Sequence, residues 1–183
     1  MKKIQVLDCT LRDGGRIMDC KFRDEVIKNI SQNLGDAHID VIEMGFIRDA
    51  KCVEYTGDST FFTSVSQIEA FIPKGRNKET SYTAFIDYGM YDFQNLEPCF
   101  GQSVDGIRVG FTRNNYKQNK HELWECFRIV KERGYKLFVQ GVNTPAYPDI
   151  EFLELIQAVN EIKPYGFGIV DTYGSMYMED AKR

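Results

Sequence analysis

Six short β-rich segments recur along the chain at similar intervals, and this rhythm constrains the fold more than any other feature of the sequence. Val, Ile, Phe and Tyr are frequent in these segments, and Gly, Asp or Asn bounds them. They cover residues 4–7, 39–43, 81–86, 106–111, 136–142 and 166–170. Their starts lie 25 to 42 residues apart. Each interval can hold a crossover helix, so the sequence predicts a parallel sheet.

Helix-like segments lie between the predicted strands. The three clearest cover residues 22–34, 121–133 and 150–162, and their apolar side chains recur every three to four positions. Asp149 is the predicted N-cap of the third helix, and Pro164 is expected to stop it. The least regular interval, residues 48–80, predicts a loop over the sheet followed by a helix near 61–71.

Two folds fit this pattern: a (β/α)₈ barrel and an open doubly wound sheet. A barrel needs eight βα units and about 250 residues, whereas this chain has 183 residues, six predicted strands and the start of a sixth helix at 175–183. We therefore expect residues 1–183 to form a single incomplete barrel domain. It would have about six βα units, with parallel strands in adjacent order, and would lack the last two units. A doubly wound sheet that binds a nucleotide is the weaker alternative, because both glycine-rich phosphate motifs are absent.

Composition excludes several classes of partner. A formal net charge of -4 does not suit binding to a phosphate backbone. No segment reaches the ~20 apolar residues of a membrane helix, so no membrane contact is expected. The chain has five cysteines, which is an odd number, and no two of them have CxxC spacing. They therefore favour a reducing cytoplasm over a disulfide framework or a zinc site.

Polar side chains gather where the predicted strands end, which is the functional edge of a parallel α/β fold. They are Asp8, Arg12, Asp13, Glu43, Asp87, Arg108, Gln140, Asn143, Asp171 and Thr172. Single Asp or Asn residues there can equally cap helices or form turns, and Arg108 inside a strand can equally form an internal salt bridge. Capping does not explain Asp8, Arg12 and Glu43 together, so these three predict a functional site.

The segment that follows the first predicted strand contains the most candidate functional residues. A carboxylate such as Asp8 can ligate a divalent cation through its oxygens. Four residues later, Arg12 can reach the same space, and its planar fork suits carboxylate or enolate oxygens. Gly14 and Gly15 allow the loop to fold tightly beside a ligand.

Three motifs of this sequence resemble those of a known superfamily. They are DCTLRDGG at residues 8–15, IEMGF at 42–46 and VDTYGS at 170–175. These are similar to the first-, second- and sixth-strand motifs of the DRE-TIM metallolyase superfamily. That superfamily includes HMG-CoA lyase, isopropylmalate and homocitrate synthases, and 4-hydroxy-2-oxovalerate aldolase. The doubled glycine most resembles the aldolase-like branch.

The resemblance implies a barrel enzyme that uses a divalent metal, Mn²⁺ or Mg²⁺, to make or break a C–C bond next to the carbonyl of a 2-oxo or acyl substrate. By this resemblance, Asp8 would ligate the metal and Arg12 would stabilise the enolate or polarise the carbonyl. Asp13 and Glu43 would support the catalytic site, with acid–base work as an expected role of Glu43. At the same edge, we expect Arg108, Asn143 and Thr172 to contact the small carbonyl substrate.

The histidine content limits this expectation. The superfamily's metal site also takes a His-x-His pair from the seventh strand, and the two histidines of this sequence, His38 and His121, form no such pair. We therefore expect a complete metal site only in an intact, longer protein, and little or no activity from these 183 residues. The alternative is a catalytically degenerate barrel fragment that acts as a binding or assembly module. Its open edge strands would allow a homo-oligomer to form.

Overall fold

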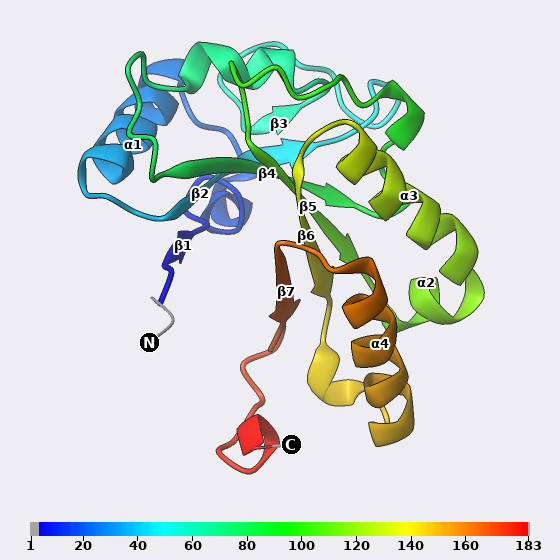
Figure 1. Cartoon of the computed structure of the whole chain (residues 1–183). Coiled ribbons are helices and arrows are strands. Elements are labelled where there is room, and N and C mark those ends of the chain that lie inside the picture. Colours follow the sequence, from blue (N-terminus) through cyan, green and yellow to red (C-terminus); the bar gives the residue numbers. More distant parts are fainter. Residues whose placement is uncertain (1–3, 183) are drawn as a thin grey trace.

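A computed structural model describes residues 4–182 and contains a curled sheet in which every strand pair is parallel (Figure 1). The strands are β1 (Leu7–Asp8), β2 (Val41–Ile47), β3 (Phe61–Phe62), β4 (Ser81–Asp87), β5 (Gly106–Phe111), β6 (Lys136–Gly141) and β7 (Gly166–Ile169). Six of them follow the order β1-β2-β4-β5-β6-β7, and β3 pairs with β2. The sheet therefore forms a half-barrel. Because adjacent strands follow chain order, the doubly wound alternative is wrong.

Helices cover the convex side of the sheet (Figure 1). They are α1 (Asp24–Asp36), α2 (Arg113–Gln118), α3 (Lys120–Glu132) and α4 (Asp149–Ile162). Local chemistry explains their ends. Thr112 caps α2 in a reciprocal capping box with Asn115, and Lys163 ends α4 in a left-handed conformation directly before Pro164.

Short 3-10 turns complete the connections between strands and helices. They are η1 (Gly14–Met18), η2 (Ser66–Phe71), η3 (Phe93–Asn95), η4 (Thr144–Ala146) and η5 (Asp180–Lys182). The first of them, η1, begins with the glycine pair of the first motif, Gly14 and Gly15. It follows the loop after β1, and Arg12 of that loop contacts Glu43 of β2.

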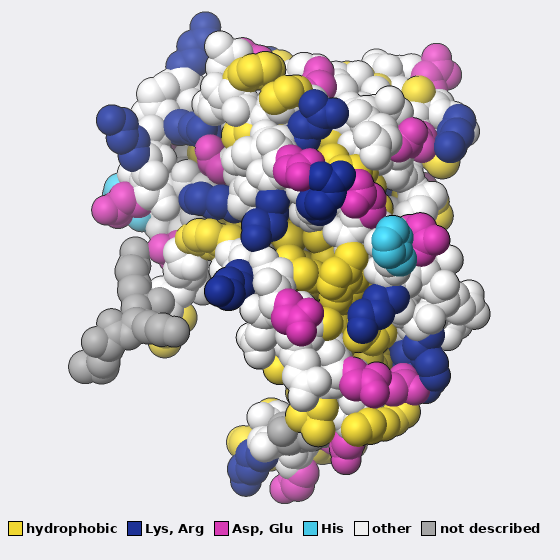
Figure 2. All heavy atoms as spheres, turned by 45° about the vertical axis from the view of Figure 1, so that its right-hand side comes forward, with side chains coloured by type: hydrophobic (Ala, Val, Ile, Leu, Met, Phe, Trp, Pro, Cys, Tyr) yellow, Lys and Arg dark blue, Asp and Glu magenta, His cyan; other side chains and the backbone are white. Residues whose placement is uncertain are grey.

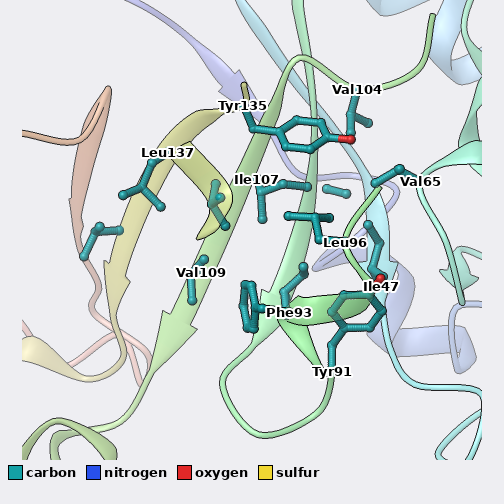
Figure 3. Packing of buried hydrophobic residues seen from close by; sticks show 14 of the residues in the cluster. Ile47, Val65, Tyr91, Phe93, Leu96, Val104, Ile107, Val109, Tyr135 and Leu137 are labelled. Carbon is teal, nitrogen blue, oxygen red and sulfur yellow. The ribbon is translucent and has the colours of Figure 1, made fainter. Parts of the chain in front are cut away.

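The main hydrophobic core lies between the sheet and its connecting segments (Figure 3). There Ile107 and Val109 of β5 pack with Leu137 of β6, with Tyr91 of the loop after β4 and with Phe93 of η3. Alternate residues of a strand point to opposite faces, so the intervening residues of these strands face the concave side. Each fully buried aliphatic or aromatic side chain stabilises the fold by about 1.5–3 kcal/mol. This core therefore fixes the half-barrel and leaves the concave face free to carry polar groups.

A bulge in β2 decides what the concave face presents. Glu43 pairs with Thr83, but Phe46 pairs with Phe85, so three steps along β2 match two along β4. The extra residue places Glu43 and Phe46 on the same side of the sheet. Gly45 makes this possible: its φ is +148°, and an added Cβ would lie 2.2 Å from the carbonyl oxygen of Thr60.

Several predictions about local structure are wrong or shifted. The first strand covers Leu7–Asp8 instead of residues 4–7. The helix predicted near 61–71 is the two-residue strand β3 followed by the 3-10 turn η2, because neighbouring Phe61 and Phe62 extend alongside β2. Asp149 is the first residue of α4, and Pro148 occupies the N-cap. The helix predicted at 175–183 is the short turn η5 in the described residues, while Arg183 lies outside them.

The surface on the side of α2, α3 and α4 mixes apolar and charged groups. Figure 2 shows hydrophobic side chains gathered between acidic and basic ones on this side. A groove of about 470 Å³ is lined there by Trp124 and Phe127 of α3 and by Ile162 of α4. Within residues 4–182, the helices are too short or too polar to cross a lipid bilayer.

Candidate functional site

One carboxylate joins two arginines on the concave face of the half-barrel. Glu43 lies on β2 and is fully buried. Its Oε2 accepts a hydrogen bond from Nε of Arg12 at 2.5 Å, and its Oε1 accepts one from Nη1 of Arg108 at 2.5 Å. Arg12 comes from the loop after β1 and Arg108 from the middle of β5. The structure thus brings together three site residues predicted from distant parts of the sequence.

Burial strengthens the electrostatic interactions among these three side chains. The side chains of Arg12 and Arg108 are only 8% and 10% exposed, so their attraction to Glu43 is weakly screened by water. Burial alone would lower the pKa of Arg12, but the contact with Glu43 outweighs it and holds that pKa above its ordinary value. Two guanidiniums against one buried carboxylate leave an excess of positive charge. The centre can therefore attract a negatively charged or polarised oxygen.

Two further side chains contact the arginines of this centre. Arg108 donates through Nη2 to the amide oxygen of Gln140 on β6. The thiol of Cys9 lies 3.7 Å from Nη2 of Arg12 and 3.5 Å from Nη1 of Arg108. Burial, and then the nearby Glu43, raise the pKa of Cys9 to about 11 despite the two arginines. Cys9 is thus a neutral thiol at neutral pH and a weak acceptor for Arg12.

Aromatic rings form the floor beneath Arg12. Its guanidinium carbon lies 4.7 Å from the ring centre of Phe85 and 5.8 Å from that of Phe46. Asp13, which is predicted to support the site, accepts a hydrogen bond from Nη1 of Arg12 at 2.7 Å and one from Nε of Arg16 at 3.2 Å. Arg12 is therefore oriented by two carboxylates and two ring faces, which is the kind of support that fixes a guanidinium in one position.

Asp8, the predicted metal ligand, makes a local turn. Its carboxylate accepts hydrogen bonds from the backbone N–H of Thr10 at 2.9 Å and from the hydroxyl of the same residue at 3.0 Å. Across residues 4–182, no group of three or more His, Cys, Asp or Glu side chains could hold a metal ion. Both oxygens of Glu43 are also committed to arginines. The described residues therefore do not fit a divalent metal site.

Asn143 and Thr172 contact each other at the carboxyl ends of β6 and β7. The backbone N–H of Asn143 donates to the hydroxyl of Thr172 at 2.9 Å. The neighbouring Asp171 caps its own turn by accepting from the backbone N–H groups of Ser175 and Met176, and these bonds lower its pKa. The structure therefore places these residues at the predicted edge, in a separate set of contacts from the Arg12–Glu43–Arg108 centre.

Sequence reasoning missed Arg16 and Arg48 as members of this region. The guanidinium carbons of Arg16 and Arg48 lie 5.0 Å and 5.2 Å from the ring centre of Phe46. Arg48 also donates from Nη2 to Asp87 at 3.0 Å. The second strand was predicted to end at residue 43, and Arg48 was assigned to the irregular interval 48–80. In the structure, β2 continues to Ile47, so Arg48 lies at its carboxyl end. The bulge at Gly45 also changes which face of the strand the later residues occupy.

A large cavity lies elsewhere. It has a volume of about 870 Å³, and its lining includes Lys28 of α1, Phe71 of η2 and Lys74. The lining residues 72–76 and 101–102 precede β4 and β5, so this cavity is at the amino ends of the strands. In parallel barrels that end serves stability, whereas the carboxyl ends carry the chemistry.

Comparison with known proteins does not add to this picture. No protein-family model matches the chain. No curated protein matches it significantly in sequence either.

Proposed function

We propose that this chain is part of an aldolase-type carbon–carbon lyase, with a barrel of the (β/α)₈ kind, that acts next to the carbonyl of a small 2-oxo or acyl substrate. The observation that carries the proposal is the buried contact between Arg12 and Glu43. It joins the first and second motifs of the resemblance to the DRE-TIM metallolyases within one charge centre. The curled parallel sheet and its chain-order topology support the barrel assignment.

Arg12 is the group that would meet the reacting oxygen. Its Nε is held by Glu43 and its Nη1 by Asp13, while its Nη2 lies 3.7 Å from the thiol of Cys9, a weak acceptor. An N–H donor of this kind can bind the carbonyl oxygen and stabilise the negative charge that develops when an enolate forms. Such a donor is typically worth about 3–4 kcal/mol in the transition state.

Glu43 fits the role of a positioning residue for Arg12 better than the acid–base role that the resemblance implies. Both of its oxygens accept from guanidiniums, and its side chain is fully buried. A base must reach the proton it removes, directly or through one water. Arg108, which is fixed by Glu43 and Gln140, would supply a second positive charge for the substrate.

A divalent metal, Mn²⁺ or Mg²⁺, would act as a Lewis acid on the substrate oxygens if the intact protein holds one. Asp8 is the only ligand that the resemblance names within these residues, so further ligands would have to come from elsewhere. A cytoplasmic location is part of the same proposal. It is supported by the five cysteines, all of which are free in the structure.

Binding of small carbonyl compounds tests this function without requiring turnover. Pyruvate has a carbonyl group where L-lactate has a hydroxyl group. Oxalate resembles the planar enolate of pyruvate. We expect the wild-type chain to bind oxalate most tightly and lactate most weakly. Arg12→Lys should remove most of this discrimination, because lysine lacks the planar fork. Arg128→Lys, an exposed change on α3, is the matched control. Equal affinity of the wild type for all three compounds would contradict the proposal.

A second candidate function, an assembly module, has its own supporting observation. β1 and β7 end the sheet, and each has one strand partner in the described part of the chain. Apolar side chains are exposed along these edges, including Ile4 before β1 and Ile169 in β7. Unpaired edges favour pairing with another copy. Light scattering distinguishes the cases: a dimer or larger species supports assembly, and a concentration-independent monomer excludes it.

A further inference from the structure

Two arginines that the proposed chemistry does not use converge on one aromatic ring beside Arg12. Arg16 comes from η1, and Arg48 follows directly after the last residue of β2. Their guanidinium carbons lie 5.0 Å and 5.2 Å from the ring centre of Phe46, and Arg48 also lies 5.0 Å from that of Phe61. Stacking on a ring face holds a guanidinium in place while its edge N–H groups stay available for hydrogen bonds.

The hydrogen-bonding capacity of both arginines exceeds what their protein partners use. A guanidinium has five N–H donors. Arg48 donates from Nη2 to Asp87 at 3.0 Å, while its buried Nε has no hydrogen-bond partner in the described structure. Arg16 donates from Nε to Asp13 at 3.2 Å, and its side chain is 57% exposed. A ligand that accepts hydrogen bonds from the remaining N–H groups of the two guanidiniums would therefore bind favourably.

The surrounding charge favours an anion. Ion pairs in this region connect four arginines with only three carboxylates: Arg12, Arg16, Arg48 and Arg108 with Asp13, Glu43 and Asp87. One positive charge is therefore in excess. Burial raises the pKa of Asp87 in spite of the neighbouring Arg48, so burial opposes the charged form of this carboxylate more than the arginine favours it.

We propose that Arg16 and Arg48 form an anion subsite that binds a carboxylate or phosphate group at the end of the substrate remote from its carbonyl. This inference rests on the proposed function and narrows its substrate class to carbonyl compounds with a second, anionic end. Arg12 and Arg48 both lie within 6 Å of the ring centre of Phe46. A short ligand that contacts Arg12 through its carbonyl oxygen would therefore also reach the subsite through its other end.

A pair of probes with the same number of carbons tests the subsite. 2-Oxoglutarate carries a second carboxylate, and 2-oxopentanoate has a methyl group in its place. We expect calorimetry on the full chain to show roughly tenfold tighter binding of 2-oxoglutarate, the effect of one charge-assisted hydrogen bond. Arg48→Gln and Arg16→Gln should each reduce this preference, and Arg48→Lys should retain part of it. Arg128→Gln, far along α3, should leave it unchanged, and circular dichroism checks that every variant is folded.

The outcomes separate the subsite from the function on which it rests. Equal binding of both oxo acids, with no effect of Arg48→Gln or Arg16→Gln, would overturn the subsite and leave the proposed function standing. Binding of glutarate as tightly as 2-oxoglutarate, with no loss in Arg12→Lys, would support the subsite and contradict the carbonyl site. Competition with inorganic phosphate and with acetate identifies the preferred anion. If phosphate displaces 2-oxoglutarate at a lower concentration than acetate does, the substrate ends in a phosphate group. If acetate displaces it at the lower concentration, the substrate ends in a carboxylate. Failure of 2-oxoglutarate, glutarate and phosphate all to bind would overturn the subsite.

Discussion

Nε of Arg12 lies 2.5 Å from Oε2 of Glu43, in a buried contact that ties the loop after β1 to the centre of β2. The two residues are 31 positions apart in the chain. Their contact turns two sequence motifs into one charged centre, and it fixes the side chain to which we assign recognition of the carbonyl oxygen.

Removal of the charge of Glu43 should destabilise the fold strongly. Glu43→Gln leaves the guanidiniums of Arg12 and Arg108 buried without a counterion between them. Breaking a buried ion pair from one side costs about 3–5 kcal/mol, so the urea midpoint should fall sharply. Glu125→Gln, which breaks an exposed contact with Arg128, should cost less than about 1 kcal/mol. Similar small losses in both variants would show that the Glu43 centre is not an energetic unit.

Gly45→Ala should disturb the bulge in β2. The new Cβ would meet the carbonyl oxygen of Thr60 at 2.2 Å, and the backbone φ of +148° is strained for alanine. Together, the clash and the strain should cost about 2 kcal/mol or more in urea unfolding. The matched control is Gly57→Ala, where φ is +85° but no atom lies within 4 Å of the added Cβ. That variant should lose only the strain energy, about 1–2 kcal/mol.

Cys9 should react slowly with thiol reagents. Its pKa of about 11, raised chiefly by burial, keeps it protonated at neutral pH, and the thiolate is the reactive form. Cys52 is exposed and should react first with Ellman's reagent at pH 8. In a Cys52→Ser variant, labelling of Cys9 followed by mass spectrometry should accelerate as the pH approaches 11. Labelling of Cys9 as fast as that of Cys52 at pH 8 would contradict the partly buried position of Cys9 beside the two arginines.

The ion pairs between α2 and α4 should make the free energy of unfolding depend on pH. Hydrogen bonds from Arg113, and then from Lys117, lower the pKa of Glu151 from 4.5 to about 2. A carboxylate with a lowered folded-state pKa stabilises the fold above its unfolded pKa, and the contribution is lost as the pH falls through the folded value. Glu151→Gln should therefore be less stable than wild type above pH 4.5 and converge with it near pH 2. Urea titrations at several pH values check this, with Glu154→Gln on the same helix as the control.

The sequence predicted the sheet well because strand periodicity is a local signal. The bounds expected for the fourth strand, 106–111, coincide with β5, and the parallel adjacent order followed from regular spacing. Local sequence patterns did not predict the secondary structure correctly where contacts between distant residues or a helix cap determine it. Phe61 and Phe62 extend because β2 offers a pairing edge, and helix α2 was missed because its polar segment, RNNYKQ, lacks an apolar rhythm and depends on its cap.

The candidate site was predictable in part for the same reason. Glu43 and Arg108 stand on strands, where sequence alternation can locate them, and Arg12 and Asp13 belong to the motif that follows the first strand. The structure brings these four residues together. The bulge at Gly45 depends on the close approach of Thr60 from a distant loop, so Phe46 and Arg48 could not be assigned to the concave face in advance. Asp8 was expected to face a metal, but its carboxylate contacts Thr10, a partner two residues away.

The most direct test of the central claim is the dissociation constant of oxalate for the wild type and for Arg12→Lys, measured by calorimetry at low ionic strength. The claim is that Arg12 binds the oxygen of a carbonyl or enolate. It predicts at least about tenfold weaker binding by Arg12→Lys, because the substitution removes a charge-assisted bond made through a planar fork. An unchanged dissociation constant, in a variant that keeps the far-ultraviolet spectrum of the wild type, would remove Arg12 from the site and contradict the proposed function.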